Sequence, residues 1–105
     1  MCPTLVLRDD KPILALGGTG GRLIPDAVFT VLARFVGLEA SPEDAIAAPR
    51  VHAEGGLDLT VERHWPAADV EFLRGLGYDL KPGNSANVHA ISVNPQTGAC
   101  RSAAR

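Results

Sequence analysis

The chain has 105 residues, 46% of them hydrophobic and 21% charged, with a formal net charge of −2. This length and composition suit one folded domain and exclude a strongly disordered chain. The balanced charge gives no reason to expect nucleic acid or an anionic membrane surface as a partner. No apolar run approaches the roughly 20 residues that a bilayer span requires, and the chain does not open with the basic and apolar regions of a signal peptide.

The first residues predict a β-hairpin. Residues 4–8 and 13–16 are short apolar runs, and the Asp9–Asp10 pair between them favours a tight turn. Because the runs are almost continuously apolar, we expect both faces of these strands to be covered. The glycine cluster Gly17–Gly21 follows, with glycine at four of its five positions, and we expect it to end the second strand.

Two helices are predicted after the glycine cluster. Apolar residues recur at three- and four-residue spacing over 27–36, which is typical of a helix. The pair Pro25–Asp26 suits its first turn, and Gly37 suits its C-cap. Ser41 is a typical N-cap for a second, shorter helix, which we expect to end before Pro49.

The rest of the chain predicts mostly strands. The elements in chain order are strands over 50–53 and 57–62, a helix over 67–76 stopped by Gly77, and strands over 78–81, 87–93 and 99–103. Hairpins and segregated helices favour the α+β class with a largely antiparallel sheet. We expect residues 1–105 to form a single domain.

The glycine cluster is the most informative feature for function. A glycine-rich turn between a strand and a helix exposes backbone N–H groups near the positive end of the helix, where they can bind a phosphate or stabilise an oxyanion. The cluster is not a Walker A loop, because the lysine and hydroxyl of that loop are missing, and it does not fit the GxGxxG pattern. The alternative is a tight turn that only requires positive φ angles.

Arg50 and His52 form a second candidate. Residues two apart on a strand face the same side, so these side chains could bind an anionic group together, and Arg50 is our candidate substrate-binding residue. The alternative is structural: Arg50 pairs with a carboxylate such as Glu62, and His52 is satisfied by the backbone.

The other reactive side chains lack a motif that would activate them. The histidines show neither HxH nor HExxH spacing, so we expect no metal and no cofactor. Neither Cys2 nor Cys100 has a local activating signature, and Ser85 does not lie in a nucleophile elbow. The residues considered are His52, His64, His89, Cys2, Cys100 and Ser85. The sequence thus offers a candidate oxyanion turn without a nucleophile–base pair.

Several motifs occur in the order in which a known family has them. They are Met1–Thr4, the hairpin with Gly17–Gly21, residues 43–52 with their Ala-Pro-Arg-Val-His ending, and Leu59–Glu62. With these motifs the chain resembles the γ-glutamyltranspeptidase family, specifically the C-terminal half of its small subunit. The resemblance rests on the collinearity of the motifs over nearly the whole chain.

The resemblance implies part of an N-terminal-nucleophile hydrolase fold, with its αββα arrangement. In that family a self-cleaved precursor exposes an N-terminal threonine, which attacks the γ-glutamyl carbonyl of glutathione or a related donor. The acyl group then passes to water, an amino acid or a peptide. A glycine pair stabilises the oxyanion, and here that pair is Gly20 and Gly21. Backbone N–H groups suit this task because they are rigid and pre-oriented towards the developing charge.

The chain departs from the family pattern in its nucleophile. The threonine, the paired serines that precede the Met1–Thr4 motif and the large subunit are absent, and Cys2 stands where serine is usual. We therefore expect a fragment or truncated homologue that contributes the oxyanion turn and is inactive by itself. Its expected partners are the missing N-terminal portion or large subunit, γ-glutamyl compounds and a second copy of the chain in a dimer.

Two other functions stay open. The glycine cluster and Arg50 could form a non-catalytic module that binds an anion or a carboxylate. Alternatively, the chain is a self-associating structural module, because strands that the missing half would cover leave apolar faces or open edges. The compartment stays open between the cytoplasm and the periplasm or extracellular space.

Overall fold

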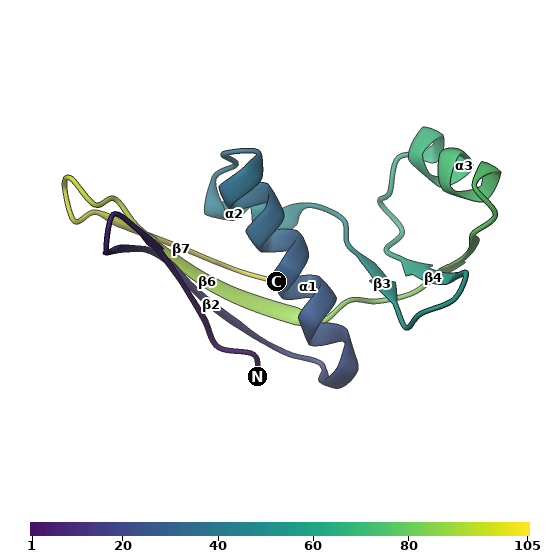
Figure 1. Cartoon of the computed structure of the whole chain (residues 1–105), viewed down its shortest axis with the longest axis horizontal. Coiled ribbons are helices and arrows are strands. Elements are labelled where there is room, and N and C mark those ends of the chain that lie inside the picture. Colours follow the sequence, from purple (N-terminus) through teal and green to yellow (C-terminus); the bar gives the residue numbers. More distant parts are fainter.

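A computed structural model describes all residues from 1 to 105. Its larger sheet has four antiparallel strands in the order β1-β2-β6-β7 (Figure 1). These strands are β1 (Thr4–Arg8), β2 (Lys11–Thr19), β6 (Asn87–Val93) and β7 (Cys100–Ala104). The pairing of β2 with β6 brings segments that are far apart in the sequence side by side.

Helices cover one face of this sheet (Figure 1). The short 3-10 turn η1 (Gly21–Leu23) leads into α1 (Ile24–Leu32), which continues as the π-helical turn η2 (Ala33–Gly37). The second helix, α2 (Pro42–Ala47), packs beside α1 on the same face. No helix of the chain is both long enough and apolar enough to cross a membrane.

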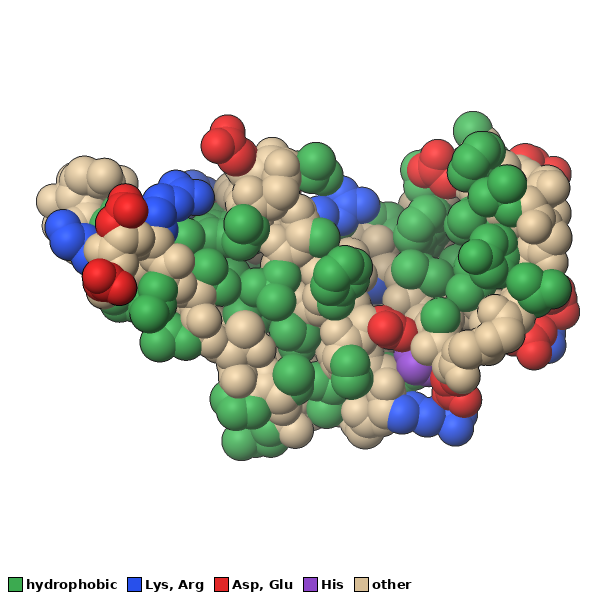
Figure 2. All heavy atoms as spheres, in the orientation of Figure 1, with side chains coloured by type: hydrophobic (Ala, Val, Ile, Leu, Met, Phe, Trp, Pro, Cys, Tyr) green, Lys and Arg blue, Asp and Glu red, His purple; other side chains and the backbone are tan.

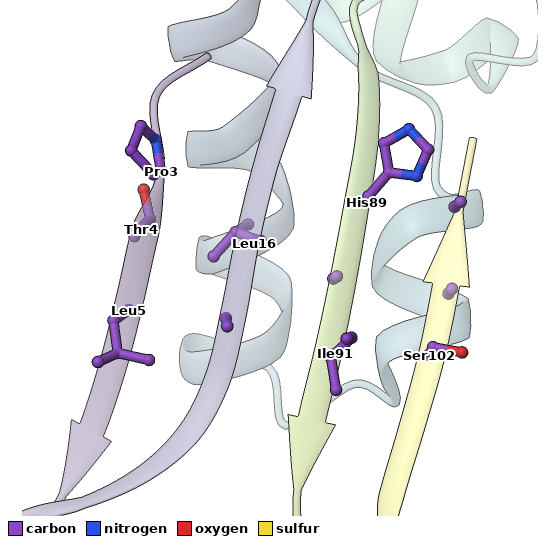
Figure 3. Close-up of a pocket in the computed structure, with 11 residues that line it drawn as sticks. Pro3, Thr4, Leu5, Leu16, His89, Ile91 and Ser102 are labelled. Carbon is purple, nitrogen blue, oxygen red and sulfur yellow. The ribbon is translucent and has the colours of Figure 1, made fainter.

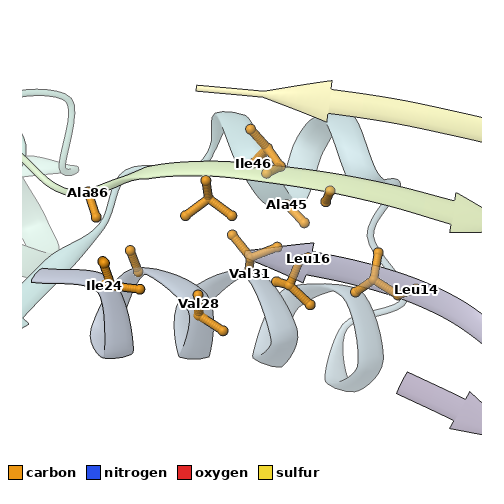
Figure 4. Packing of buried hydrophobic residues seen from close by; sticks show 11 residues of the cluster. Leu14, Leu16, Ile24, Val28, Val31, Ala45, Ile46 and Ala86 are labelled. Atoms are coloured by element: carbon orange, nitrogen blue, oxygen red, sulfur yellow. The ribbon is translucent and has the colours of Figure 1, made fainter. Parts of the chain in front are cut away.

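The main hydrophobic core lies between the larger sheet and these helices (Figure 4). Leu14 of β2, Val31 of α1 and Val88 of β6 are at most 1% exposed. The buried cluster consists of Leu14, Leu16, Ile24, Ala27, Val28, Val31, Ala45, Ile46, Ala86, Val88 and Ala90. Burial of these side chains is the main force that fixes α1 and α2 on the sheet.

A smaller sheet lies beside the first one, in the order β3-β4-β5. Its strands are β3 (Val51–Ala53), β4 (Asp58–Val61) and β5 (Asp79–Pro82). β4 and β5 are parallel, and α3 (Ala67–Gly75) forms the crossover that a parallel pair requires. The hydrophobic core of this sheet consists of only Leu59, Val61 and Leu80.

The two sheets give the molecule an elongated shape. Its extents are 46 × 27 × 21 Å, and its radius of gyration is 14.8 Å. A compact domain of this length has a radius of gyration of about 13 Å. The smaller sheet therefore extends the molecule along its longest axis rather than covering the larger sheet.

The predicted order of helices and strands is confirmed, and so is the α+β class. The local signals acted as expected: the Ser41 side chain accepts a hydrogen bond from the Asp44 N–H at 3.1 Å, and Gly77 has a φ of 97° just after α3. The parallel pair β4–β5 is the exception to the antiparallel pairing.

Two local predictions are wrong. The glycine cluster does not end β2, because Gly17 and Gly18 pair with His89 and Val88 of β6. A Cβ atom on Gly18 would lie 2.7 Å from the carbonyl oxygen of Asn87, so glycine permits this close pairing. Gly37 is not the residue that turns the chain after α1; Glu39 has the positive φ of 54° instead.

The expectation that both faces of the hairpin are covered is also wrong. We call the uncovered side of the larger sheet the open face. It presents alternate residues of all four strands, among them Leu5, Ala15, His89, Ile91, Ser102 and Ala104. Leu5 is 60% exposed and Ile91 50%. The face is open because α1 and α2 lie on the same side and the smaller sheet lies beside it.

Candidate functional site

The glycine turn, Gly20–Gly21, connects β2 to η1 and lies at the surface. Gly20 has a φ of 146° and Gly21 a φ of 59°. The carbonyl of Gly20 accepts the N–H of Leu23 at 3.2 Å, which bends the chain into α1. The N–H groups of Gly20 and Gly21 donate to no acceptor in the chain. The turn thus leaves two adjacent backbone donors free, four and three residues before the first residue of α1.

Ala86 supports the glycine turn from the side of the sheet. A Cβ atom on Gly20 would lie 2.7 Å from the Cβ of Ala86 and 2.9 Å from its Cα. The same atom on Gly21 would meet nothing within 4 Å. Gly20 is therefore required by both its φ and its contact with Ala86, whereas Gly21 is favoured by its φ alone.

Arg50 lies in the core, just before β3. Its side chain is almost fully buried, with 1% of the residue exposed. Nη1 donates to the carbonyl of Ala86 at 2.7 Å, and Nη2 donates to the carbonyl of Ile46 at 2.8 Å. Burial, assisted by the nearby charge of Arg105 and opposed by Glu62, lowers the pKa of the Arg50 guanidinium below its usual value.

This placement differs from both sequence interpretations of Arg50. The side chain is buried and does not share an exposed strand face with His52; its Nη1 and Nη2 donate to backbone carbonyls, whereas its buried Nε has no hydrogen-bond partner. The expected partner Glu62 is present, but its Oε2 accepts the backbone N–H of Arg50 at 2.8 Å and forms an ion pair with Arg105. Arg50 instead donates a hydrogen bond to Ala86, the residue that the glycine turn packs against.

His52 is bound by carboxylates rather than by the backbone. Its Nδ1 lies 2.7 Å from Oδ2 of Asp26, and its Nε2 lies 3.0 Å from Oε1 of Glu54. Asp26 also accepts the backbone N–H of Ala53 at 2.9 Å. Sequence reasoning missed this cluster, because Asp26 and His52 lie on separate elements and no local pattern joins them.

The other candidate residues are dispersed. His64 is exposed between β4 and α3, and His89 is exposed on the open face, so neither lies in the cluster around His52. Cys2 and Cys100 are free and exposed.

An apolar hollow lies on the open face, away from the glycine turn. It has a volume of about 740 Å³ and is lined mainly by apolar side chains (Figure 3). In Figure 3 the helices lie behind the sheet, and Leu5, His89 and Ile91 stand on its uncovered side. Neither glycine of the turn lines the hollow, and Arg50 does not line it either. The candidate site is thus an exposed turn rather than a closed pocket.

Comparison with known proteins relates the whole chain to one family. The family model described as gamma-glutamyltranspeptidase matches residues 1–105. The glutathione hydrolase proenzyme of Pseudomonas aeruginosa is 33% identical over 100 residues, which cover 90% of this chain and 18% of that protein. The Bacillus subtilis glutathione hydrolase proenzyme is 27% identical over 100 residues, 93% of this chain and 17% of its own length. The chain thus spans less than a fifth of these relatives.

Solved structures agree in fold. A mutant of Helicobacter pylori γ-glutamyltranspeptidase superposes with a TM-score of 0.89 at 29% identity, over 100% of this chain and 58% of that chain. The cephalosporin acylase of Bacillus halodurans gives a TM-score of 0.89 at 23% identity, over 95% of this chain and 19% of that one, which speaks for the fold only. The chain therefore belongs to the γ-glutamyltranspeptidase family and has the α+β architecture of part of an N-terminal-nucleophile hydrolase.

Proposed function

We propose that residues 1–105 supply the oxyanion-stabilising turn of an enzyme that transfers or hydrolyses γ-glutamyl groups of glutathione-like donors. In this proposal the nucleophilic threonine comes from polypeptide outside these residues. The observation that carries the proposal is the pair of free N–H groups of Gly20 and Gly21 on an exposed turn close to the start of α1. Family membership supports the substrate class.

The turn would act on the charge that develops during acyl transfer. As the threonine hydroxyl oxygen bonds to the γ-glutamyl carbonyl carbon, its proton passes to a general base outside these residues and the π electrons of the carbonyl move to the carbonyl oxygen. Two N–H groups then stabilise that oxyanion until the electrons return and the C–N bond breaks, with the leaving amine taking up that proton. Water or an acceptor amine releases the acyl group by the same sequence. One such donor lowers the barrier by roughly 3–4 kcal/mol.

Rigidity of the turn is the contribution of this chain's own residues. Gly20 packs against Ala86, and the carbonyl of Ala86 accepts a hydrogen bond from buried Arg50. Donors that are already oriented cost no reorganisation when the charge appears. This arrangement supports the assignment of Gly20 and Gly21 as the oxyanion pair and of Arg50 as a positioning residue.

A first test uses the chain as it stands. Purified residues 1–105 should release no p-nitroaniline from γ-glutamyl-p-nitroanilide above the rate of a blank, because the nucleophile is supplied from elsewhere. Steady turnover by the chain alone would overturn the proposed division of the active site.

A second test removes a single donor in an assembled enzyme. Residues 1–105 would replace the matched segment of the Pseudomonas aeruginosa relative, and Gly21 would be exchanged for glycolic acid, which replaces its N–H by an ester oxygen. The proposal predicts a kcat lower by about 100- to 1,000-fold with little change in KM. Gly56 is the matched control, because it is an exposed glycine with a φ of 73° and open space around it. An equal kcat for both esters would overturn the assignment.

The same free donors favour one non-catalytic alternative, a module that binds a carboxylate at the glycine turn. Calorimetric titration of the chain with glutamate and with glutathione tests it. Saturable heat that disappears in the Gly21 ester would support carboxylate binding, and the absence of heat at millimolar ligand would remove it.

A further inference from the structure

Four charged side chains form a continuous series beside the glycine turn, which we call the charge chain: Arg22, Glu54, His52 and Asp26. Arg22 Nε lies 2.6 Å from Oε1 of Glu54, and the same oxygen lies 3.0 Å from Nε2 of His52. Nδ1 of His52 lies 2.7 Å from Oδ2 of Asp26. Figure 2 shows a histidine among acidic side chains with a basic side chain beside them on this face of the molecule.

The charge chain joins three parts of the fold. Arg22 belongs to η1 and directly follows Gly21, Asp26 lies in the first turn of α1, and His52 and Glu54 come from β3 and the residues after it. Asp26 and Glu54 are the charged groups in contact with the imidazole, and Arg22 is connected to it through Glu54; Thr60, the partner of His52 on β4, is uncharged. The charge chain therefore ties Arg22, the residue after the glycine turn, to the smaller sheet.

The two short contacts of His52 are both hydrogen bonds in only one protonation state of the ring. An ionised carboxylate can only accept hydrogen bonds, and a neutral imidazole has one N–H and one lone pair. Both contacts are hydrogen bonds only when both ring nitrogens carry hydrogen. Oε1 of Glu54 also pairs with Nε of Arg22, and Asp26 accepts the Ala53 N–H through the same oxygen that faces His52. The side chain of His52 is only 8% exposed, so water does not replace a missing contact freely.

Loss of one proton would turn one of the two contacts into a repulsion. The Asp26 contact is the shorter one, and Asp26 is also fixed by the Ala53 N–H, so a neutral His52 would keep its hydrogen on Nδ1. The lone pair of Nε2 would then face Oε1 of Glu54. Glu54 is about half exposed and would turn towards solvent together with Arg22.

We propose that the charge chain is a proton-controlled clamp on the glycine turn, closed when His52 is an imidazolium and open when it is neutral. Asp26, His52, Glu54 and Arg22 are then positioning residues for the two free N–H groups. The effect of the clamp on catalysis rests on the proposed function. Its effect on the conformation of the turn does not, and it can be measured on the chain alone without substrate.

Nuclear magnetic resonance of the ¹⁵N-labelled chain between pH 5 and 8.5 tests the clamp. At the acidic end both ring nitrogens of His52 should carry hydrogen, and on titration Nε2 should lose its hydrogen while Nδ1 keeps it. The amide signals of Gly21 and Arg22 should move with the same midpoint as the His52 ring. The rings of His64 and His89 serve as internal controls, because both lie outside the charge chain.

A matched pair of variants separates the clamp from general effects of charge. Glu54→Gln should abolish the pH response of the Gly21 and Arg22 amides, since a side-chain amide can donate to a neutral Nε2. Glu71→Gln removes an exposed carboxylate that pairs with Arg74 on α3, and it should leave the response intact. Gly21 and Arg22 amides that stay constant while His52 titrates, or a response that survives Glu54→Gln, would overturn the clamp. An inactive assembled enzyme with this response intact would refute the proposed function only.

Discussion

Gly20 and Gly21 are neighbours in the turn, yet they differ in what a methyl group would meet. At Gly20 the group would overlap with Ala86 and the backbone would keep a φ of 146°, whereas at Gly21 it would point into open space at a φ of 59°. The first position is restricted by packing and backbone together. The second is restricted only by the left-handed backbone, which asparagine also tolerates.

Alanine at these two positions should therefore have unequal effects on stability. Gly20→Ala should lower the free energy of unfolding by about 2–5 kcal/mol, because it adds overlap to backbone strain. Gly21→Ala should lower it by about 1–2 kcal/mol, the cost of a left-handed alanine. Urea denaturation measures both. Equal losses would show that Ala86 yields to the added methyl group.

At the scale of elements, Arg50 is the residue that connects the larger and the smaller sheet. Its side chain reaches the carbonyls of Ala86 and Ile46 in the first part of the fold, and its own carbonyl accepts Trp65 Nε1 at 2.8 Å in the second. The hydrogen bonds of Arg50 thus link α2, the residue before β6 and the loop before α3.

Replacement of Arg50 by methionine should destabilise the chain markedly. The carbonyl of Ala86 would lose its donor in a buried position, while that of Ile46 would keep a bond from Arg105 Nε at 3.1 Å. We expect a loss of about 2–4 kcal/mol in the free energy of unfolding, measured by urea denaturation. Arg74→Met, which removes an exposed cation from α3, should change stability by less than about 0.5 kcal/mol. Similar losses in the two variants would contradict the connecting role of Arg50.

The sequence predicts the elements well because their signals are local. Helical spacing of apolar residues, the Ser41 cap and the glycine after α3 each act within a few residues. The extension of β2 through Gly17 and Gly18 was missed because it depends on pairing with β6, far along the chain. The His52 cluster was missed for the same reason, since Asp26 comes from α1. The family resemblance is confirmed because collinear motifs carry long-range information that periodicity lacks.

At the scale of the whole molecule, the open face is an apolar surface that no helix covers. Leu5, Ile91 and their neighbours line a hollow with no Lys, Arg, Asp or Glu among its residues. An exposed apolar patch in water favours association with another surface. Alone in solution, the chain has a second copy of itself as the available partner.

We therefore predict concentration-dependent dimerisation through the open face. Leu5→Glu combined with Ile91→Glu should convert the dimer to monomer in sedimentation velocity runs, because it places charges on the apolar contact. Phe72→Glu is the control, since Phe72 is 66% exposed on α3, away from this face. Monomers at every concentration, or equal dissociation by Phe72→Glu, would show that the open face does not mediate self-association.

The unequal cores of the two sheets imply that the molecule opens in parts. The buried hydrophobic cluster of the larger sheet has eleven residues and that of the smaller sheet has three, and α3 buries none. Segments with few buried apolar contacts open at lower free energy than the global transition. Native-state amide hydrogen exchange should therefore release β4, β5 and α3 as one early unit, while β2 and β6 exchange only on global unfolding. Because β3 pairs with β4, the segment that carries His52 and Glu54, half of the clamp on the glycine turn, would then lose its neighbouring strand first.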